Sequence, residues 1–287
     1  MKRSIMKTEY SDRYCKHDNA EISVGGADRK SSRWRKFRKF LFIKIPVIFI
    51  VFSVLWVLLL KWCPVPVTPL MIQRSIEYRG DDSFRTYKKW VPYKKITPEM
   101  ARAVIAGEDI LFINHIGFDR ESLRNAREEY ETGRREYLRG ASTISQQTAK
   151  NVFLFPSRSY VRKVLEAYFT ILIEVIWGKK RIMEVYLNVI ETGRGLYGVE
   201  AAANHIFHTT AAKLTRDQCC LIAACLPNPR VRDASNPSSD VRSHAFKIRI
   251  LQSRLHYPAW IYHMKTKYKK TPFVKKDFDQ IHKTTKK

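Results

Sequence analysis

The apolar segment at residues 40–62, FLFIKIPVIFIVFSVLWVLLLKW, constrains the fold of this chain more than any other feature. Between Ile45 and Leu60 its only polar residue is Ser53. A helix of about 20 such residues is long enough to span the hydrocarbon core of a bilayer. Trp56 and Trp62 suit the membrane interface. The segment therefore predicts one N-terminal transmembrane helix.

Two other interpretations of this segment are disfavoured. A buried core helix rarely runs this long without charge. A cleaved signal peptide has a shorter apolar region, about 7–15 residues, followed by small residues, whereas KWCPVPVTPL follows here. Because basic residues crowd the chain before the segment, as in RKSSRWRKFRKF, its N-terminus is predicted to be cytoplasmic. We therefore expect a single-pass protein of the inner (cytoplasmic) membrane with its main domain on the periplasmic or extracytoplasmic side.

The charge balance indicates an anionic partner. Lysines and arginines outnumber acids 53 to 27, which gives a net charge of +26. Such a balance fits nucleic acid, a membrane surface or a phosphate-bearing substrate. A domain outside the cytoplasm considerably weakens the case for nucleic acid, so the sequence favours the membrane and a phosphate-bearing substrate and predicts no nucleic-acid partner.

Patterning along the chain divides it into five parts. The predicted core is mainly α-helical, because its apolar residues recur at helical spacing, and the connector before it has some strand character. The parts are a basic cytoplasmic tail (1–39), the transmembrane helix (40–62), a connector (63–98), a domain core (71–229) that overlaps the connector, and a C-terminal helix with a basic tail (230–287).

Two adjacent acids, Glu108 and Asp109, follow the apolar face of a helix predicted to begin after Thr97. An acid at the C-terminal end of a helix is mildly unfavourable because of the helix dipole. A solvated helix end and a functional pair remain equally supported by composition alone.

The stretch RGASTISQQTAKNVF, residues 139–153, carries a dense band of neutral polar side chains. Thr143 and Gln146 fit a capping box, so a helix is predicted to begin there. One cap uses only one hydroxyl and one amide. The remaining groups either face solvent or bind a partner rich in hydroxyls and amides, such as a sugar carrying N-acetyl and peptide groups.

The stretch RKVLEAYFTILIEVIW, residues 162–177, predicts a helix that is apolar on all sides and therefore buried. Glu166 lies within it, one turn after Arg162 and Lys163. A buried carboxylate needs a partner, so a structural salt bridge is one interpretation. Arg158, Arg162 and Lys163 together exceed the charge of one glutamate, and this surplus suits a phosphate or pyrophosphate.

Four motifs occur in one order behind the apolar segment: EDILFINHIGFD, GASTISQQTAKN, RKVLE and KKRIMEVYLN. In this order and spacing they resemble the glycosyltransferase family 51 domain over about residues 71–229. The resemblance implies a mainly α, lysozyme-like fold with a large lobe and a small membrane-facing lobe. It also implies an inverting peptidoglycan glycosyltransferase of cell-wall biosynthesis, which polymerises lipid II into β-1,4-linked glycan strands and releases undecaprenyl pyrophosphate. The chain resembles the monofunctional members, which lack a transpeptidase domain.

The resemblance also implies roles for individual residues. Glu108 would be the catalytic base that deprotonates the acceptor hydroxyl. Glu166 would support the leaving pyrophosphate, directly or by binding a divalent cation, Mg²⁺ or Mn²⁺, and no other cofactor is implied. Contacts to sugar and phosphate would come from Asp109, His115, Ser142, Gln146, Gln147, Lys150, Arg158, Arg162 and Lys163.

Three rival functions stay open at this point. One is a basic nucleic-acid binder, which would need its basic domain on the cytoplasmic side. A glycan-cleaving, lysozyme-like enzyme needs no pyrophosphate site, which the cationic cluster near Glu166 disfavours. A non-catalytic membrane scaffold of the cell-wall machinery would not need both glutamates. The implied partners are lipid II, the growing glycan strand, the membrane, and proteins of cell division or elongation.

Overall fold

The computed structural model describes residues 40–119, 142–157 and 159–263, together with residues 124, 128, 131 and 132. The predicted basic tail at 1–39, the last part of the C-terminal region and Arg158 lie outside the described residues. The chain divides into two compact units, Met1–Ser53 and Val54–Lys287.

Most of the described residues are helical, which confirms the prediction of a mainly α-helical domain behind one apolar helix. The elements in chain order are η1 (Phe40–Lys44), α2 (Ile45–Trp62), α3 (Pro69–Glu77), β1 (Tyr87–Lys88), η2 (Tyr93–Lys95), α4 (Pro98–Glu108), α6 (Ile144–Phe153), α7 (Tyr160–Ile176), α8 (Gly178–Val189), β2 (Glu191–Gly193), β3 (Leu196–Tyr197), α9 (Val199–Phe207), α10 (Arg216–Cys225) and α11 (Ser239–Arg254).

The apolar segment forms a continuous helix, η1 followed by α2. Among the described residues it is the one helix long and apolar enough to cross a membrane, at 23 residues and a mean hydropathy of 2.7. Its single hydroxyl is satisfied within the helix, because Ser53 donates to the carbonyl of Ile50 at 2.9 Å. Such back-bonding removes the cost of an unpaired polar group in an apolar segment.

The C-terminal end of α2 is held by side chains that flank the start of α8. The indole Nε1 of Trp177 donates to the carbonyl of Val57 at 2.7 Å. Arg181 donates to the carbonyl oxygens of Leu60 at 2.8 Å and Cys63 at 2.5 Å. The last carbonyls of a helix have no partner within it, so a cation here satisfies them and also meets the negative end of the helix dipole.

The strand character predicted for the connector was wrong over most of its length. Residues 69–77 form helix α3, which begins at Thr68, where the side-chain oxygen accepts from the backbone N–H of Met71 at 3.3 Å. Pro69 stands in the first turn, where its fixed φ favours a helix and its missing N–H costs nothing. Within this connector the predicted strand character is confirmed only at β1. Strand β1 pairs in parallel with β3, and β2 pairs antiparallel with β3.

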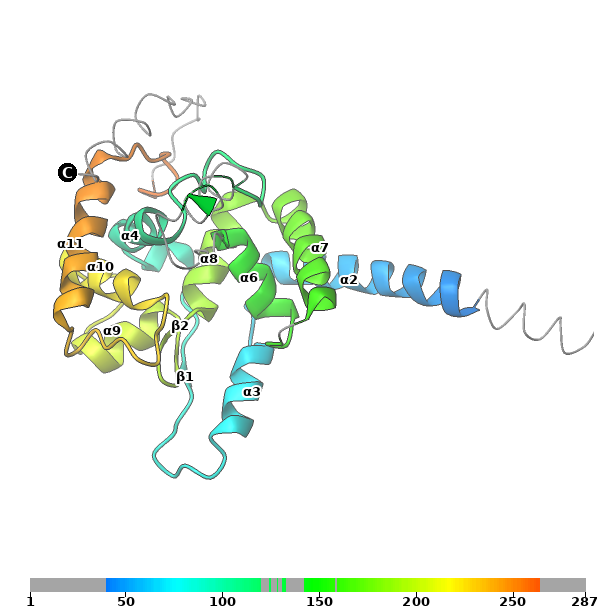
Figure 1. Ribbon diagram of the computed structural model, residues 1–287, viewed down its shortest axis with the longest axis horizontal. Coiled ribbons are helices and arrows are strands. Elements are labelled where there is room, and N and C mark those ends of the chain that lie inside the picture. The colour runs from blue at the N-terminus through cyan, green and yellow to red at the C-terminus, as the bar shows by residue number, and fades with distance from the viewer. Residues whose placement is uncertain are drawn as a thin grey trace, which may run out of the picture. The chain divides into compact units, whose positions relative to one another are not determined.

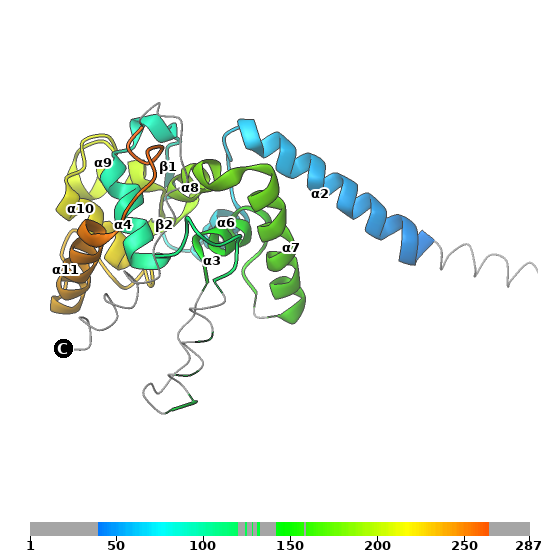
Figure 2. The ribbon, with the colours of Figure 1, turned by 90° about the horizontal axis from the view of Figure 1, so that it is seen from above.

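Two groups of helices build the domain core. Helices α4, α10 and α11 pack side by side, and α6 packs against α7 and α8 (Figures 1 and 2). One continuous cluster of buried apolar side chains runs through both groups. Helix α11 therefore shares the core, although the sequence placed it outside the domain at residues 230–287. The two groups bring the C-terminal end of α4 toward the N-terminal end of α6, where the candidate site lies.

The prediction that the helix at residues 162–177 is buried on all sides was wrong. Its apolar side chains Val161, Val164 and Val175 are 70%, 68% and 76% exposed, and Tyr160 is 94% exposed. Positions 160, 164, 171 and 175 lie along one stripe of α7, because their spacings of four, seven and four residues are close to one or two helical turns. An apolar stripe facing outward marks contact with another apolar surface. Glu166 lies on the opposite, buried side.

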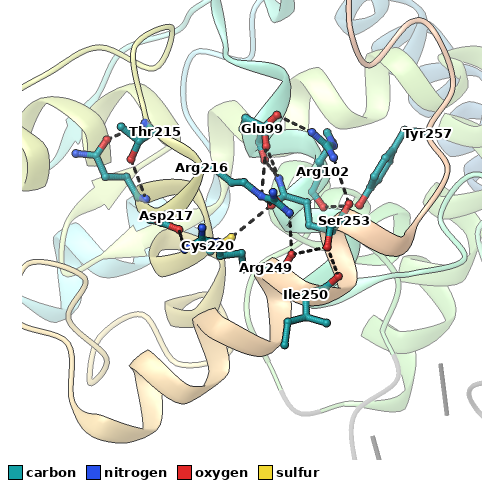
Figure 3. Close-up of polar contacts among 12 residues, drawn as sticks. Glu99, Arg102, Thr215, Arg216, Asp217, Cys220, Arg249, Ile250, Ser253 and Tyr257 are labelled. Atoms are coloured by element: carbon teal, nitrogen blue, oxygen red, sulfur yellow. Dashed lines mark hydrogen bonds and ion pairs between the residues drawn. The ribbon is translucent and has the colours of Figure 1, made fainter. Parts of the chain in front are cut away.

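A polar cluster joins the helices of the first group (Figure 3). Gln252 of α11 is fully buried and donates to the carbonyl and the carboxylate of Glu99, at 3.0 and 2.9 Å. Its Oε1 atom accepts from Arg216 at 2.9 Å. Glu99 also accepts from Arg102 at 2.6 Å, and the Arg102 guanidinium lies 5.1 Å from the centre of the Tyr257 ring. One amide thus links α4, α10 and α11.

Replacing Gln252 with leucine is expected to destabilise the domain. The apolar side chain fills the space but loses the hydrogen bonds of the buried amide. Among the described residues, Glu99 then keeps only Arg102 as a donor. Arg216 keeps the carbonyl of Arg249. We expect a loss of about 2–3 kcal/mol. We expect the midpoint of thermal unfolding to fall by roughly 5–10 °C. Ser253→Ala, at the neighbouring exposed position of the same helix, is the control. Equal midpoints for the two variants would show that the amide does not hold the three helices together.

Candidate active site

Glu108 is the last residue of α4 and is half-buried. Its Oε2 atom accepts a hydrogen bond from the side-chain amide of Gln147 on α6 at 2.8 Å. The free carbonyls at the end of a helix repel a negative charge. A donor from a neighbouring helix therefore offsets that repulsion and fixes the direction in which the carboxylate points.

Asp109 joins the end of α4 to the start of α6. Its Oδ2 atom accepts from the backbone N–H of Ile144, the first residue of α6, at 2.9 Å. His115 Nε2 lies 2.9 Å from Asp109 Oδ1. Both side chains are buried. The structure thus places Asp109 and His115, predicted as substrate contacts, in a pair that holds the loop after Glu108 against α6.

Helix α6 begins with the predicted capping box, which is confirmed. The Thr143 side chain accepts from the backbone N–H of Gln146, and the Gln146 side chain accepts from the backbone N–H of Thr143 at 3.0 Å. Thr143 also donates to the carbonyl of Gly117 at 2.7 Å. Gly117 has φ +78, and a Cβ there would lie 2.7 Å from Thr170, so glycine is required. Gln146 is buried in this cap, whereas Gln147 faces Glu108.

Helix α7 presents a carboxylate held between two cations. Glu166 has a side chain only 3% exposed, and it accepts from Arg162 at 2.6 Å and from Lys163 at 2.5 Å. The salt bridge predicted from the sequence is present. Ser159 caps the helix by accepting from the backbone N–H of Arg162 at 3.1 Å. The two cations thus lie in the first turn, where the positive end of the helix dipole adds to their field.

The ammonium group of Lys150 interacts electrostatically with both carboxylates, Glu108 and Glu166. Burial lowers the pKa of its ammonium group, and the charges of Glu166 and Glu108 oppose that shift. The positive charges of Arg162 and Lys163 lower the pKa further. Lys150 therefore lies within the field of both the base candidate on α4 and the cationic cluster on α7.

The remaining predicted site residues are placed as follows. Ser142 is exposed at the start of α6, where its backbone carbonyl accepts from Gln147 at 3.3 Å. Arg158 lies outside the described residues. The structure therefore brings together Glu108, Gln147, Lys150, Glu166, Arg162 and Lys163, and it uses Asp109, His115 and Gln146 in the frame that supports them.

The donor set around Glu166 does not fit a divalent cation. Both carboxylate oxygens already accept from cationic side chains. Within residues 40–119, 142–157 and 159–263, no group of three or more His, Cys, Asp or Glu side chains gathers that could hold a metal ion. Hard divalent cations bind several oxygen ligands. These side chains suit an anion.

Sequence reasoning missed two residues next to this site, Glu174 and Tyr186. Glu174 of α7 accepts from Ser145 at 2.5 Å and from Lys179 at 2.6 Å, and so ties α6 and α8 to α7. Tyr186 of α8 donates to Gln147 Oε1 at 3.1 Å. A second acid in an apolar helix was a signal for Glu174. Tyr186 sits at ordinary core spacing and gives no such signal.

A half-buried carboxylate on one helix and a cationic cluster at the start of another suit the transfer of a group from a substrate with an anionic leaving group. The transglycosylase family model matches residues 77–252. The chain belongs to this transglycosylase family.

The matches with three curated relatives cover most of the length of each relative. The biosynthetic peptidoglycan transglycosylase of Caulobacter vibrioides is 50% identical over 214 residues, 75% of this chain and 90% of the relative. The protein of the same name from Bdellovibrio bacteriovorus is 50% identical over 211 residues, 73% of this chain and 83% of the relative. That of Bacteroides thetaiotaomicron is 51% identical over 194 residues, 67% of this chain and 77% of the relative.

Proposed function

We propose that this chain is a peptidoglycan glycosyltransferase that polymerises lipid II into β-1,4-linked glycan strands in cell-wall biosynthesis. The observation that carries the proposal is that one site combines two features. Glu108 is held by Gln147 at 2.8 Å, and the first turn of α7 is cationic. The membership of the transglycosylase family and the names of the relatives support it.

The proposed chemistry is a single displacement with inversion. Glu108 takes the proton of the 4-hydroxyl of the acceptor sugar while that oxygen attacks the anomeric carbon of the donor. A new C–O bond forms, the bond from the anomeric carbon to the diphosphate breaks, and its electron pair leaves with undecaprenyl pyrophosphate. Lys150, Arg162 and Lys163 stabilise the negative charge that develops on the leaving oxygen. Base and leaving-group stabilisation thus act on opposite sides of the ring.

We further propose that the enzyme is anchored in the cytoplasmic membrane, with the catalytic domain on the outer side. The 23-residue apolar helix and the basic residues before it support this orientation. The exposed apolar stripe of α7 supports a lobe that faces lipid. An active site close to the bilayer suits a substrate whose lipid tail stays in it. Partner proteins of cell division or elongation remain a prediction.

The proposal is tested with the purified full-length chain in detergent micelles. Labelled lipid II should be converted into a ladder of glycan strands, with and without a chelator of divalent cations. The same protein should leave finished glycan strands unchanged, which separates synthesis from lysozyme-like cleavage. Shortening of finished glycan without any product from lipid II would overturn the proposal. No product from either substrate would favour the non-catalytic scaffold.

A further inference from the structure

We infer that Tyr186 is a positioning residue whose buried hydroxyl, acting through the amide of Gln147, holds the Glu108 carboxylate in the direction needed to accept the acceptor's proton. The chain of contacts is short. Tyr186 donates to Gln147 Oε1 at 3.1 Å, and Gln147 Nε2 donates to Glu108 Oε2 at 2.8 Å. The inference rests on the proposed function, because Glu108 is the base only in that reaction.

The surroundings of Gln147 determine which way its amide points. Its Nε2 atom faces the Glu108 carboxylate and, at 3.3 Å, the backbone carbonyl of Ser142. Both of these groups accept hydrogen bonds and neither donates. The amide oxygen is therefore left for the Tyr186 hydroxyl, which must donate. A flipped Gln147 amide would place its oxygen against the Glu108 carboxylate, where two acceptors would face each other. It would also turn the NH2 group, which only donates, toward the Tyr186 hydroxyl.

Tyr186 is suited to this role because it remains a fixed, neutral donor. Its side chain is fully buried in α8, which packs against α6 and α7. Burial raises the pKa of its hydroxyl well above the usual value, and the negative charges of Glu108 and Asp109 raise it further. The hydroxyl therefore keeps its proton throughout the pH range in which a carboxylate base works, and core packing prevents it from moving away.

Glu108 needs such an arrangement because of its place in the fold. It ends α4, where the helix carbonyls disfavour a negative charge, and it is half-exposed. Gln147 is also half-buried and long enough to change rotamer. Without an anchor in the core, the amide and the carboxylate would both sample orientations in which the base does not face the acceptor hydroxyl.

The test compares Tyr186→Phe with Tyr197→Phe in the full-length protein. Tyr197 is a matched control, because it is also fully buried but its hydroxyl has no hydrogen-bond partner among the described residues. For Tyr186→Phe we expect the kcat of lipid II polymerisation to fall about 10-fold to 100-fold, part of the 10²–10⁴ that general-base help supplies. KM should change little, because the hydroxyl does not bind substrate. Tyr197→Phe should leave both constants unchanged.

The pH profile separates positioning from a general loss of folding. An N–H that donates to a carboxylate favours its charged form. Loosening that bond in Tyr186→Phe should move the acidic limb of the kcat profile to higher pH, and Tyr197→Phe should not move it. A drop in the thermal midpoint with an unchanged limb and an unchanged kcat would overturn the inference.

A double-mutant cycle checks that Tyr186 acts through Gln147. Gln147→Ala removes the link, so Tyr186→Phe should cause no further loss of kcat in that background. Additive losses would overturn the inference. The wild-type protein must itself form glycan from lipid II. If it does not, the proposed function fails and this inference with it, whereas normal wild-type polymerisation with equal Tyr186→Phe and Tyr197→Phe rates overturns the positioning role alone.

Discussion

Replacing Glu108 with glutamine is expected to abolish glycan synthesis from lipid II while the fold survives. Glutamine has nearly the same shape, and its amide oxygen can still accept from Gln147, so the contact between α4 and α6 at 2.8 Å is retained. It cannot take the proton of an attacking hydroxyl. General-base assistance accounts for about 10²–10⁴ in rate, so the initial rate of polymerisation should fall by that factor.

The control for this variant is Glu77→Gln on α3. Glu77 is exposed and pairs with Arg74 at the surface, where such pairs contribute little. Both variants should unfold at nearly the wild-type temperature, and only the one at position 108 should lose activity. Near-normal polymerisation by Glu108→Gln would remove this carboxylate from the role of base.

Replacing Glu166 with glutamine is expected to give the second large loss. The carboxylate holds Arg162 at 2.6 Å and Lys163 at 2.5 Å in the first turn of α7. A neutral amide has one acceptor atom and no charge, so it cannot orient both cations. Preorganised groups that meet developing charge are each worth about 10²–10³ in rate. We expect a loss of this size in kcat, measured as the initial rate of polymerisation at saturating lipid II.

Stability should change much less than activity in Glu166→Gln. The Lys163 side chain is 51% exposed, so it can be solvated by water once its partner is gone. Asp217→Asn, which breaks the exposed pair with Arg249 at 2.8 Å, is the control for losing an ion pair away from the site. If the variant at position 166 unfolded far earlier and kept its kcat per folded molecule, Glu166 would be a purely structural residue.

Local features of the fold were predictable from the sequence. The start of α6 followed from Thr143 and Gln146, because a capping box is encoded within four residues. The helix after Thr97 was placed correctly for a similar reason, since Pro98 and the apolar spacing mark its first turns. The salt bridge of Glu166 was also predictable, because its partners lie three and four residues before it on the same helix.

Features that depend on distant parts of the chain were not predictable in this way. Tyr186 and Gln147 are 39 residues apart, and nothing in either local pattern indicates the contact. The exposure of α7 was missed because the spacing of apolar residues shows which sides of a helix are apolar. It does not show whether such a side packs against the rest of the domain. The same limit applied to Gln146 and Gln147, adjacent amides of which one closes a cap and the other faces Glu108.

The hydrogen bonds from Trp177 and Arg181 to the end of α2 have a consequence for how the apolar helix is coupled to α8. These side chains bind the carbonyls of Val57, Leu60 and Cys63. The backbone that follows the apolar helix therefore cannot rotate freely about the end of that helix. Arg181 lies near the start of α8, and Tyr186 lies on the same helix. Because the last turn of α2 belongs to the same compact unit as α8, any movement of that turn is passed to the helix that carries Tyr186.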